Sequence, residues 1–397
     1  MGADGPVRLL TFTTLYPNRA QPFHGLFVER RLRRLVATGA VQARVVAPVP
    51  WFPWRSKAFG SYARFARVPS VEDVDGLRVT HPRYPVIPKV GMGVAPSLMA
   101  SFVGRHVRNV LRQRDFDLVD AHYFYPDGVA AARIARTLRR PLVITARGSD
   151  VNLIATYASA RRQILRAAEE AAAIITVSDA LRRKLLDLGV RDDKITVLRN
   201  GVDLAEFRPD EHAAARVTGR ALLSVGQLVI GKGHDVAIRA VSEIPDARLV
   251  IAGDGPLRRD LERLAQSCGA KDRVTFLGQV NQEALLRCYN AADATILASA
   301  REGMPNVVLE SLACGTPVIA SSVGGIPEIM TSEVAGVMLE ETSPDCLREA
   351  ILKVLRSTRS RSLVRAFAQR FSWEPTIGAQ VALYRKVLAD AGSRAVP

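Results

Sequence analysis

The sequence has few cysteines and no long apolar run. Its four cysteines, among 397 residues, lie at spacings that match no metal motif and give no sign of a secreted disulfide framework. We therefore expect a reduced, cytoplasmic compartment. The longest apolar stretches, such as Val94 to Val103, hold about ten residues, whereas a bilayer span needs about 20. Val7 to Thr13 resembles a first strand more than a signal peptide, because Arg8 is the only basic residue near the N-terminal end and no cleavage site follows.

Lysine is also scarce, with 8 Lys against 47 Arg, and the basic residues are unevenly placed. Residues 1–205 hold 32 Lys and Arg against 17 Asp and Glu, whereas residues 206–397 hold 23 against 22. A one-sided positive field attracts anionic lipid, phosphorylated substrates or nucleic acid. No nucleic-acid-binding motif is present, and the aromatic residues do not interleave with the charge, so we expect no nucleic-acid partner. Compositional drift toward arginine is the alternative explanation.

Short β-branched runs alternate with amphipathic helical patterns along the whole chain. This alternation predicts an α/β protein with parallel sheets built from βαβ units. The expected strands are Val7–Thr13, Gln42–Ala47, Leu77–Thr80, Asp117–Ala121, Leu142–Ala146, Ile174–Val177, Ile195–Leu198, Ala221–Val225, Leu249–Ala252, Val274–Leu277, Ala294–Leu297 and Pro317–Ala320. The expected helices are Phe27–Thr38, Gly128–Leu138, Ala180–Leu188, Asp235–Ile244, Leu257–Ser267 and Asn306–Ala313, followed by two helices between Ser360 and Ala391.

A linker is expected at Arg199 to Asp210, which holds Asn-Gly and Pro and shows neither helical nor strand periodicity. We therefore predict two Rossmann-like domains that face a central cleft. The N-terminal domain covers residues 1–203 and the C-terminal domain covers residues 204–375; the family resemblance of the motifs described next implies that the first binds the acceptor and the second binds the donor. Residues 376–397 form a terminal helix that packs back on the N-terminal domain.

The strongest motif is REGMPNVVLESLACGTPVIASSVGGIPE, from Arg301 to Glu328. Glu302 ends a loop after a strand, and Gly303-Met304-Pro305-Asn306-Val307 then enters a helix that carries Glu310. Backbone N–H groups and the helix dipole stabilise phosphate oxygens at such a helix start. Carboxylates can accept hydrogen bonds from the hydroxyls of ribose and of a sugar. The segment resembles the signature of retaining glycosyltransferase family 4, which has the GT-B fold.

The resemblance assigns roles to these residues and extends over about residues 5–390. It implies that Glu302 contacts the donor sugar, that Glu310 contacts ribose, and that Gly303 to Val307 contact sugar and phosphate. Within the family, the loops resemble those of a bacterial subgroup that includes the teichuronic-acid type of transferase.

A second match, VGQLVIGKGHD from Val225 to Asp235, places Lys232 where its ammonium would neutralise a diphosphate. The family usually carries an arginine where this chain has Gln227, and Arg147 or Arg199 could substitute for it. A third match, Gly253-Asp254-Gly255-Pro256, follows a strand, and we expect Gly253 and Gly255 to line the nucleoside pocket.

Three loops of the N-terminal half complete the candidate site. Gly25 precedes the first helix, His122 follows a buried strand, and Arg147 and Asp150 follow the next strand. The resemblance implies that His122 lies near the donor sugar and stabilises its developing positive charge. We expect Gly25, Arg147 and Asp150 to bind donor phosphate or sugar hydroxyls. A histidine satisfied by loop backbone is the alternative for His122.

The implied reaction is retaining transfer of a hexosyl group from a UDP- or GDP-sugar to a glycan or lipid-linked acceptor, in the synthesis of cell-surface polysaccharide or glycolipid. His122, Lys232 and Glu302 are the expected catalytic residues. A nucleotide-sugar epimerase or hydrolase on the same scaffold is the alternative. We see no Asp-x-Asp motif after a strand and expect no metal requirement. No G-x-G-x-x-G follows a first strand, which disfavours a nicotinamide cofactor.

The Pro-rich loop from Pro48 to Lys57 places Trp51, Phe52 and Trp54 beside two basic residues, a composition that suits a membrane interface. Together with the basic N-terminal half, it predicts peripheral contact with anionic lipid at the inner face of the cell membrane. A packed loop or an acceptor-pocket lid is the alternative.

Overall fold

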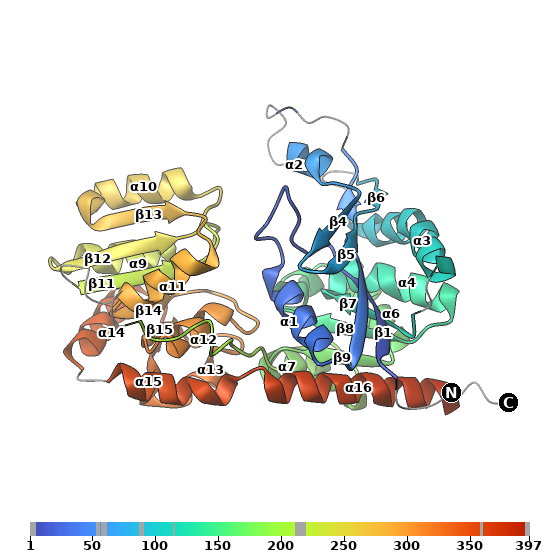
Figure 1. Cartoon of the computed structure of the whole chain (residues 1–397). Coiled ribbons are helices and arrows are strands. Elements are labelled where there is room, and N and C mark those ends of the chain that lie inside the picture. Colours follow the sequence, from blue (N-terminus) through green and yellow to red (C-terminus); the bar gives the residue numbers. More distant parts are fainter. Residues whose placement is uncertain are drawn as a thin grey trace. The chain divides into compact units, whose positions relative to one another are not determined.

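The computed structural model describes residues 5–52, 56, 62–86, 91–113, 116–210, 220–357 and 360–393. They form two compact units: unit 1 is Met1–Arg199 with Pro375–Pro397, and unit 2 is Asn200–Glu374 (Figure 1). The sequence placed the first boundary four residues later, after position 203. Gly201 and Val202 belong with unit 2 because Gly201 packs on the Trp373 ring and Val202 forms a β-bridge with Ser372.

Unit 1 contains an eight-stranded sheet of the described residues, in the order β10-β9-β8-β7-β1-β2-β5-β4. Its strands are β1 (Val7–Phe12), β2 (Val41–Val46), β4 (Val71–Val74), β5 (Leu77–Thr80), β7 (Leu118–His122), β8 (Leu142–Ala146), β9 (Ala173–Thr176) and β10 (Ile195–Val197). A separate parallel pair joins β3 (Val49–Pro50) to β6 (Arg83–Tyr84). Strand β8 is buried along its whole length, as expected for a strand of a parallel sheet covered on both faces.

The helices of unit 1 follow the strands in alternation. They are α1 (Leu26–Ala37), α2 (Tyr62–Arg67), α3 (Ala95–Gln113), α4 (Val129–Leu138), α5 (Ser149–Asn152), α6 (Ala158–Glu170) and α7 (Asp179–Asp187), with short turns η2 (Gly91–Gly93), η3 (Phe124–Gly128), η4 (Ile154–Thr156) and η5 (Asp192–Lys194). Helix α16 (Glu374–Ser393) returns from unit 2 and, from Pro375 onward, belongs to unit 1. Helices α3 and α4 pack side by side.

Unit 2 contains a six-stranded parallel sheet of the described residues, in the order β13-β12-β11-β14-β15-β16. Its strands are β11 (Arg220–Val225), β12 (Ala247–Ala252), β13 (Val274–Gly278), β14 (Ala294–Leu297), β15 (Val318–Ser321) and β16 (Gly336–Leu339). Numbered within the unit, this order is 3-2-1-4-5-6, the order of the dinucleotide-binding Rossmann fold.

Helices cover the sheet of unit 2 on both faces. They are α9 (His234–Ser242), α10 (Arg258–Ser267), α11 (Gln282–Ala291), α12 (Asn306–Ala313), α13 (Ile326–Ile329), α14 (Pro344–Arg356) and α15 (Arg361–Ala368), with turns η6 (Lys271–Arg273), η7 (Glu333–Ala335) and η8 (Gln369–Phe371). Helix α9 packs between α10 and α14. Leu222 and Ile296 of the central strands lie in the same buried apolar cluster as residues of these three helices.

Most expected elements are confirmed to within two residues, but the sheet of unit 1 is not purely parallel. Strands β4 and β5 form an antiparallel hairpin, with Asp75 and Gly76 at positive φ in the turn. An Asp-x-Asp triplet, Asp73-Val74-Asp75, lies at the end of β4, where we expected none. Asp73 accepts the Gly76 N–H at 2.8 Å, and Asp75 pairs with Arg33 at 2.9 Å, so both carboxylates hold the hairpin.

Within the described residues, no helix is both long enough and apolar enough to cross a membrane.

The core of unit 2 gives a stability prediction. Leu222 is fully buried in central strand β11, so Leu222→Ala should lower the free energy of unfolding of unit 2 by about 2–5 kcal/mol. Leu363→Ala is the matched control, because Leu363 is exposed, and its effect should stay within about 0.5 kcal/mol. Denaturant unfolding followed by circular dichroism measures both. Equal effects of the two substitutions would contradict the assigned core.

Candidate active site

Unit 2 has a topological switch point between β11 and β14, where the strand order reverses. Ligands of open α/β sheets bind outside the carboxyl ends of the strands at such a point. Lys232 lies in the loop after β11, and Glu302 lies in the loop after β14. The Lys232 Nζ lies 2.6 Å from the Glu302 Oε1, with side chains 30% and 11% exposed. The structure therefore brings together two of the three predicted catalytic residues.

Glycines let these loops approach closely. Gly233, at φ 71°, follows Lys232, and a Cβ there would lie 2.0 Å from the Ala298 carbonyl oxygen. Gly324, at φ 56°, lies against Glu302, whose carbonyl oxygen would be 2.1 Å from an added Cβ. A side chain at Gly233 would displace the loop that carries Lys232, and one at Gly324 would displace the loop that carries Glu302. The Gly-Gly turn of the signature thus holds the Glu302 loop in place.

Hydrogen bonds from the Asn200 side chain and the Gly325 backbone hold the segment Gly303 to Val307 in place. The Asn200 Nδ2 donates to the Met304 carbonyl at 3.1 Å and to the Asn306 Oδ1 at 2.9 Å. The Gly325 N–H donates to the Gly303 carbonyl at 2.8 Å. Gly303, Met304 and Pro305 are buried, and Asn306 and Val307 are half-buried at the start of α12. Sequence reasoning missed Asn200, which it assigned only to a turn in the linker.

Glu310 lies in the second turn of α12 and is buried. The Tyr289 hydroxyl donates to its Oε2 at 3.0 Å, and the Tyr289 ring packs edge-on against Phe207. Tyr289 therefore sets the orientation of the carboxylate predicted to bind ribose. Sequence reasoning also missed Tyr289, because it comes from α11 and shares no local motif with α12.

The side chain of Gln227 is exposed, and its backbone carbonyl accepts a hydrogen bond from His234. The His234 Nε2 donates to the Gln227 carbonyl at 3.3 Å, and the Nδ1 accepts from the Ser224 hydroxyl at 2.9 Å. Burial lowers the pKa of His234, so its ring is neutral and holds the loop that carries Lys232. His234 is another residue that sequence reasoning missed.

The loop after β12 lies against the loop after β11. The Gly253 N–H donates to the Gly278 carbonyl at 2.8 Å. A Cβ on Gly253 would lie 1.8 Å from the Gly226 carbonyl oxygen, and one on Gly255 would lie 2.5 Å from that of Leu228. Gly253 and Gly255 therefore serve close backbone packing, and their expected role in lining a nucleoside pocket stays a prediction.

Unit 1 has its own switch point, between β1 and β7. His122 ends β7, and Arg147 directly follows the neighbouring strand β8. The Arg147 Nη2 donates to the His122 Nδ1 at 2.9 Å, so the Nδ1 carries no proton. The His122 Nε2 then donates to the Asp120 Oδ2 at 2.9 Å. The His122 side chain is only 2% exposed, and burial lowers its pKa, so the ring is neutral.

Arg147 is held between His122 and the ring of Phe27, which lies 5.2 Å from its guanidinium carbon. Burial, helped by the charge of Arg31, lowers its pKa to about 9. Its Nε and Nη1 are buried and make no hydrogen bond to the described residues.

Asp150 and Gly25 have structural contacts. The buried Asp150 carboxylate accepts N–H groups of Phe124 at 2.8 Å, Gly148 at 2.7 Å and Arg147 at 3.1 Å. It therefore organises the loop that positions Arg147, and donor binding by Asp150 stays a prediction. Gly25 begins α1 at φ 70°, and an added Cβ would lie 2.3 Å from the carbonyl oxygen of Leu15.

Asp127 is a buried carboxyl that sequence reasoning missed. It accepts the Thr14 hydroxyl at 2.9 Å, and burial raises its pKa to about 7. The two groups connect the loop after β1 to the turn η3 that follows β7.

The described ranges contain no group of three or more His, Cys, Asp or Glu side chains placed to hold a metal ion.

Comparison with protein families agrees with the fold and with the signature. A family model described as Glycosyl transferases group 1 matches residues 209–371, and one described as Glycosyltransferase Family 4 matches residues 63–206. A Bacillus subtilis protein named as the teichuronic acid biosynthesis glycosyltransferase TuaC is 28% identical over 404 residues, covering 98% of this chain and 96% of the relative. A D-inositol 3-phosphate glycosyltransferase of Mycolicibacterium vanbaalenii is 31% identical over 313 residues, covering 70% and 69%.

Solved structures agree on the fold. Sucrose-phosphate synthase from Thermosynechococcus elongatus superposes with a TM-score of 0.79 at 21% identity, covering 97% of this chain and all of the other. Anabaena Alr3699/HepE, crystallised in complex with UDP-glucose, gives a TM-score of 0.69 at 20% identity and covers 98% of this chain and 99% of the other. With two α/β units, the signature from Arg301 to Glu328 and these relatives, the chain belongs to glycosyltransferase family 4 and is a glycosyltransferase with the GT-B fold.

Proposed function

We propose that this glycosyltransferase moves a hexosyl group, with retention of anomeric configuration, from a UDP-sugar to a glycan or lipid-linked acceptor of the cell surface. The observation that carries the proposal is the Lys232–Glu302 pair at the switch point of unit 2, beside the start of α12. A diphosphate placed there would meet an ammonium group and the positive end of a helix dipole. Glu302 would accept sugar hydroxyls, and Glu310 would accept the ribose hydroxyls.

The chemistry would be mainly electrostatic. The anomeric carbon becomes positive as the bond to the leaving phosphate breaks, and the diphosphate gains negative charge. Lys232 and the first N–H groups of α12 would stabilise the leaving group more strongly in the transition state than in the ground state. The departing phosphate oxygen would take the acceptor's proton while the acceptor attacks from the same face. Since the ammonium group and the helix dipole supply the positive charge, we expect no metal requirement.

His122 would contribute as a neutral dipole near the transferred sugar, because both of its ring nitrogens are held in hydrogen bonds. The two buried nitrogens of Arg147 that lack hydrogen bonds to described residues would bind a donor oxygen.

The choice of UDP has independent support. The structure of Anabaena Alr3699/HepE, which has the same fold, was solved with UDP and with UDP-glucose. The polysaccharide acceptor is supported by the relative TuaC, which matches nearly the whole chain.

A membrane-facing surface is supported by helix α3 of unit 1. Val94, directly before this helix, and Phe102 on it are exposed apolar residues, with Phe102 56% exposed. Arg105 and Arg108 are also exposed and follow Phe102 at helical spacings that place them along one side of α3. Exposed aromatic and basic side chains on one helix suit the interface of an anionic bilayer.

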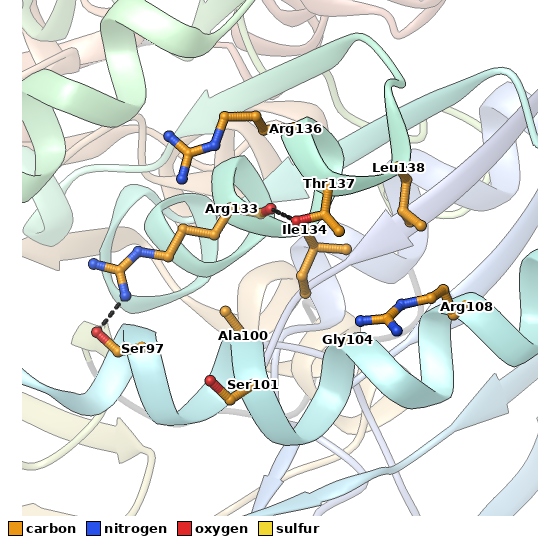
Figure 2. A pocket seen from close by; sticks show the side chains of 10 residues that line it. All are labelled: Ser97, Ala100, Ser101, Gly104, Arg108, Arg133, Ile134, Arg136, Thr137 and Leu138. Carbon is orange, nitrogen blue, oxygen red and sulfur yellow. Dashed lines mark hydrogen bonds between the residues drawn. The ribbon is translucent and has the colours of Figure 1, made fainter.

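A hollow of about 280 Å³ between α3 and α4 adds to this surface. Figure 2 shows Arg133 and Arg108 at opposite ends of the hollow, with Ala100 and Ile134 between them. The Ser97 hydroxyl accepts a hydrogen bond from Arg133. Such a hollow could receive a lipid phosphate. Of the loop proposed from the sequence, Trp51 is 59% exposed, whereas Trp54, Arg55 and Lys57 lie outside the described residues.

The donor assignment predicts the effect of changing Glu310. Glu310→Gln should weaken UDP binding about 10- to 150-fold, because hydrogen bonds to a charged group contribute about 1.5–3 kcal/mol. Calorimetric titration with UDP and with GDP measures this change and the choice of base. Glu283→Gln, on an exposed side chain of α11 in the same unit, is the control and should bind like wild type. Unchanged binding by Glu310→Gln would contradict the ribose assignment.

The leaving-group assignment predicts that Lys232→Met lowers kcat by about 10²–10³-fold, the loss typical of one electrostatic contact to a developing anion. Lys271→Met, at an exposed position of unit 2, should leave kcat unchanged. Turnover of UDP-sugar with acceptor is measured with and without EDTA, which should make no difference. Full turnover by Lys232→Met would contradict the assignment, and loss of activity in EDTA would contradict the metal-free mechanism.

The membrane surface predicts that the double variant Arg105→Glu/Arg108→Glu sediments with phosphatidylglycerol vesicles at least about 30-fold more weakly than wild type. Loss of two basic residues, at about 1 kcal/mol each near an anionic surface, accounts for about 30-fold, and the reversed charge adds to this loss. Phe102→Ser should also weaken binding. Arg263→Glu, on an exposed side chain of unit 2, is the control. Equal sedimentation of all variants would contradict the assignment of α3 to a membrane-facing surface.

A further inference from the structure

Arg258, the first residue of helix α10, is held against strand β13 of unit 2 by three contacts. Its Nε donates to the Glu262 Oε1 at 2.8 Å, and its Nη2 donates to the Phe276 carbonyl at 3.3 Å. The guanidinium carbon also lies 5.6 Å from the centre of the Phe276 ring, within the range of a cation–π contact. Phe276 itself packs against the apolar core of the unit. The guanidinium is therefore fixed in place although the side chain is 36% exposed.

The third nitrogen of this guanidinium faces a gap left by a glycine. The Nη1 makes no hydrogen bond to any residue that the structure describes. It lies 3.4 Å from the point where a Cβ on Gly278 would be, and apart from the chain neighbours of Gly278 no other described atom lies within 4 Å of that point. A Cβ on Gly253 or Gly255 would instead collide with backbone. The side of Gly278 that lacks a side chain is therefore open, and a hydrogen-bond donor faces it.

The open side of Gly278 lies at the ligand-binding edge of the sheet. Gly278 ends β13, Gly253 directly follows β12, and the Gly253 N–H donates to the Gly278 carbonyl at 2.8 Å. Because the strands are parallel, both lie at the same edge as the end of β11, which the loop with Lys232 follows. Neighbouring strands lie about 4.8 Å apart, so β13 is about 10 Å from β11. A nucleotide with its diphosphate at Lys232 therefore has room to place its base near Gly278, with the ribose between them.

The chemistry of a guanidinium restricts which base fits beside it. A guanidinium can only donate hydrogen bonds. Uracil carries the acceptor O4 at the ring position where cytosine carries an amino group, which is a donor. The O4 would accept a bond from the Arg258 Nη1, whereas the amino group of cytosine would leave two donors facing each other. Since β13 is the outermost strand of its sheet, the edge of the base that reaches Gly278 is the one farthest from the ribose, and O4 lies on that edge.

We propose that Arg258 selects the base of the donor: its Nη1 donates to the O4 of uracil, so that a uridine diphosphate is bound and a cytidine diphosphate is rejected. The inference rests on the proposed function, which places the donor diphosphate at Lys232. Glu262 and Phe276 hold the guanidinium in this direction before the ligand arrives, so little side-chain freedom is lost on binding. The choice of UDP is thereby assigned to one side chain of this protein.

Calorimetric titration of the full-length enzyme with UDP and with CDP tests the inference, because the two differ only in the group at ring position 4 and the proton on N3. Wild type should bind UDP at least about 10-fold more tightly than CDP, the effect of one hydrogen bond to a charged group. Arg258→Met removes every donor and should weaken UDP binding to the level of CDP, with CDP binding unchanged. Arg259→Met, on the exposed neighbouring arginine, is the matched control and should keep the wild-type preference.

Sulfur-substituted UDP identifies the atom that Arg258 contacts. Sulfur is a weaker acceptor than oxygen, so 4-thio-UDP should bind wild type more weakly than UDP, whereas 2-thio-UDP should bind like UDP. Arg258→Met should bind UDP and 4-thio-UDP equally. Weaker binding of 2-thio-UDP together with unchanged binding of 4-thio-UDP would overturn the assignment of O4.

Two results with Arg258→Met would also overturn the inference. An unchanged preference for UDP would show that another group selects the base. Equal loss of UDP and CDP binding would show that Arg258 only fastens α10 to β13, whereas retained CDP binding shows that the variant is folded.

Glu310→Gln separates this inference from the proposed function. It should weaken UDP and CDP binding by the same factor, because both nucleotides carry the same ribose. Unchanged binding of both nucleotides by Glu310→Gln, with the loss of preference in Arg258→Met, would refute the ribose assignment and leave the role of Arg258 supported. A wild type that binds neither nucleotide would refute the proposed donor site, and the role of Arg258 with it.

Discussion

The ion pair between Lys232 and Glu302 is the contact that organises the candidate donor site of unit 2. It joins the loops that follow β11 and β14, which are the two strands on either side of the switch point. Both loops reach the pair only because Gly233 and Gly324 let backbone approach where a Cβ would collide. The pair is partly shielded from water, so its charges interact more strongly with each other, and with an anionic ligand, than exposed charges would. The sheet order thus brings an ammonium group and a carboxylate together at the switch point, where we propose that the donor diphosphate binds.

At the switch point of unit 1, buried charged side chains lie where unit 2 has glycine-rich loops. This switch point ends in His122 and Arg147, and the energetic cost of burying Arg31, Arg147 and Asp120 is offset by hydrogen bonds to the neutral side chains of Gln380 and His122. Because the arginines outnumber the carboxylate, the cluster keeps a positive character that suits an oxygen-rich or anionic ligand. Each unit therefore has a switch point in its sheet, and the two switch points carry different chemistry.

The sequence predicts those parts of the fold in which neighbouring residues carry the signal. Leu142–Ala146, Ala294–Leu297 and Asn306–Ala313 match the structure to the residue, since an apolar run or a helical period is bounded by turn residues. The hairpin of β4 and β5 was missed although Asp75-Gly76 is a strong turn signal. Asp120 also had a signal: it lies two residues before His122, on the same face of a buried strand. Tyr289 and Asn200 had none, because their contacts come from distant segments that only folding brings together.

The most direct measurement is the crystal structure of the enzyme soaked with UDP. We expect density for the diphosphate within hydrogen-bond distance of the Lys232 Nζ and the first N–H groups of α12, with the ribose hydroxyls at Glu310. Density for the nucleotide at any other place on unit 2, or on unit 1 alone, would contradict the assignment of the donor site.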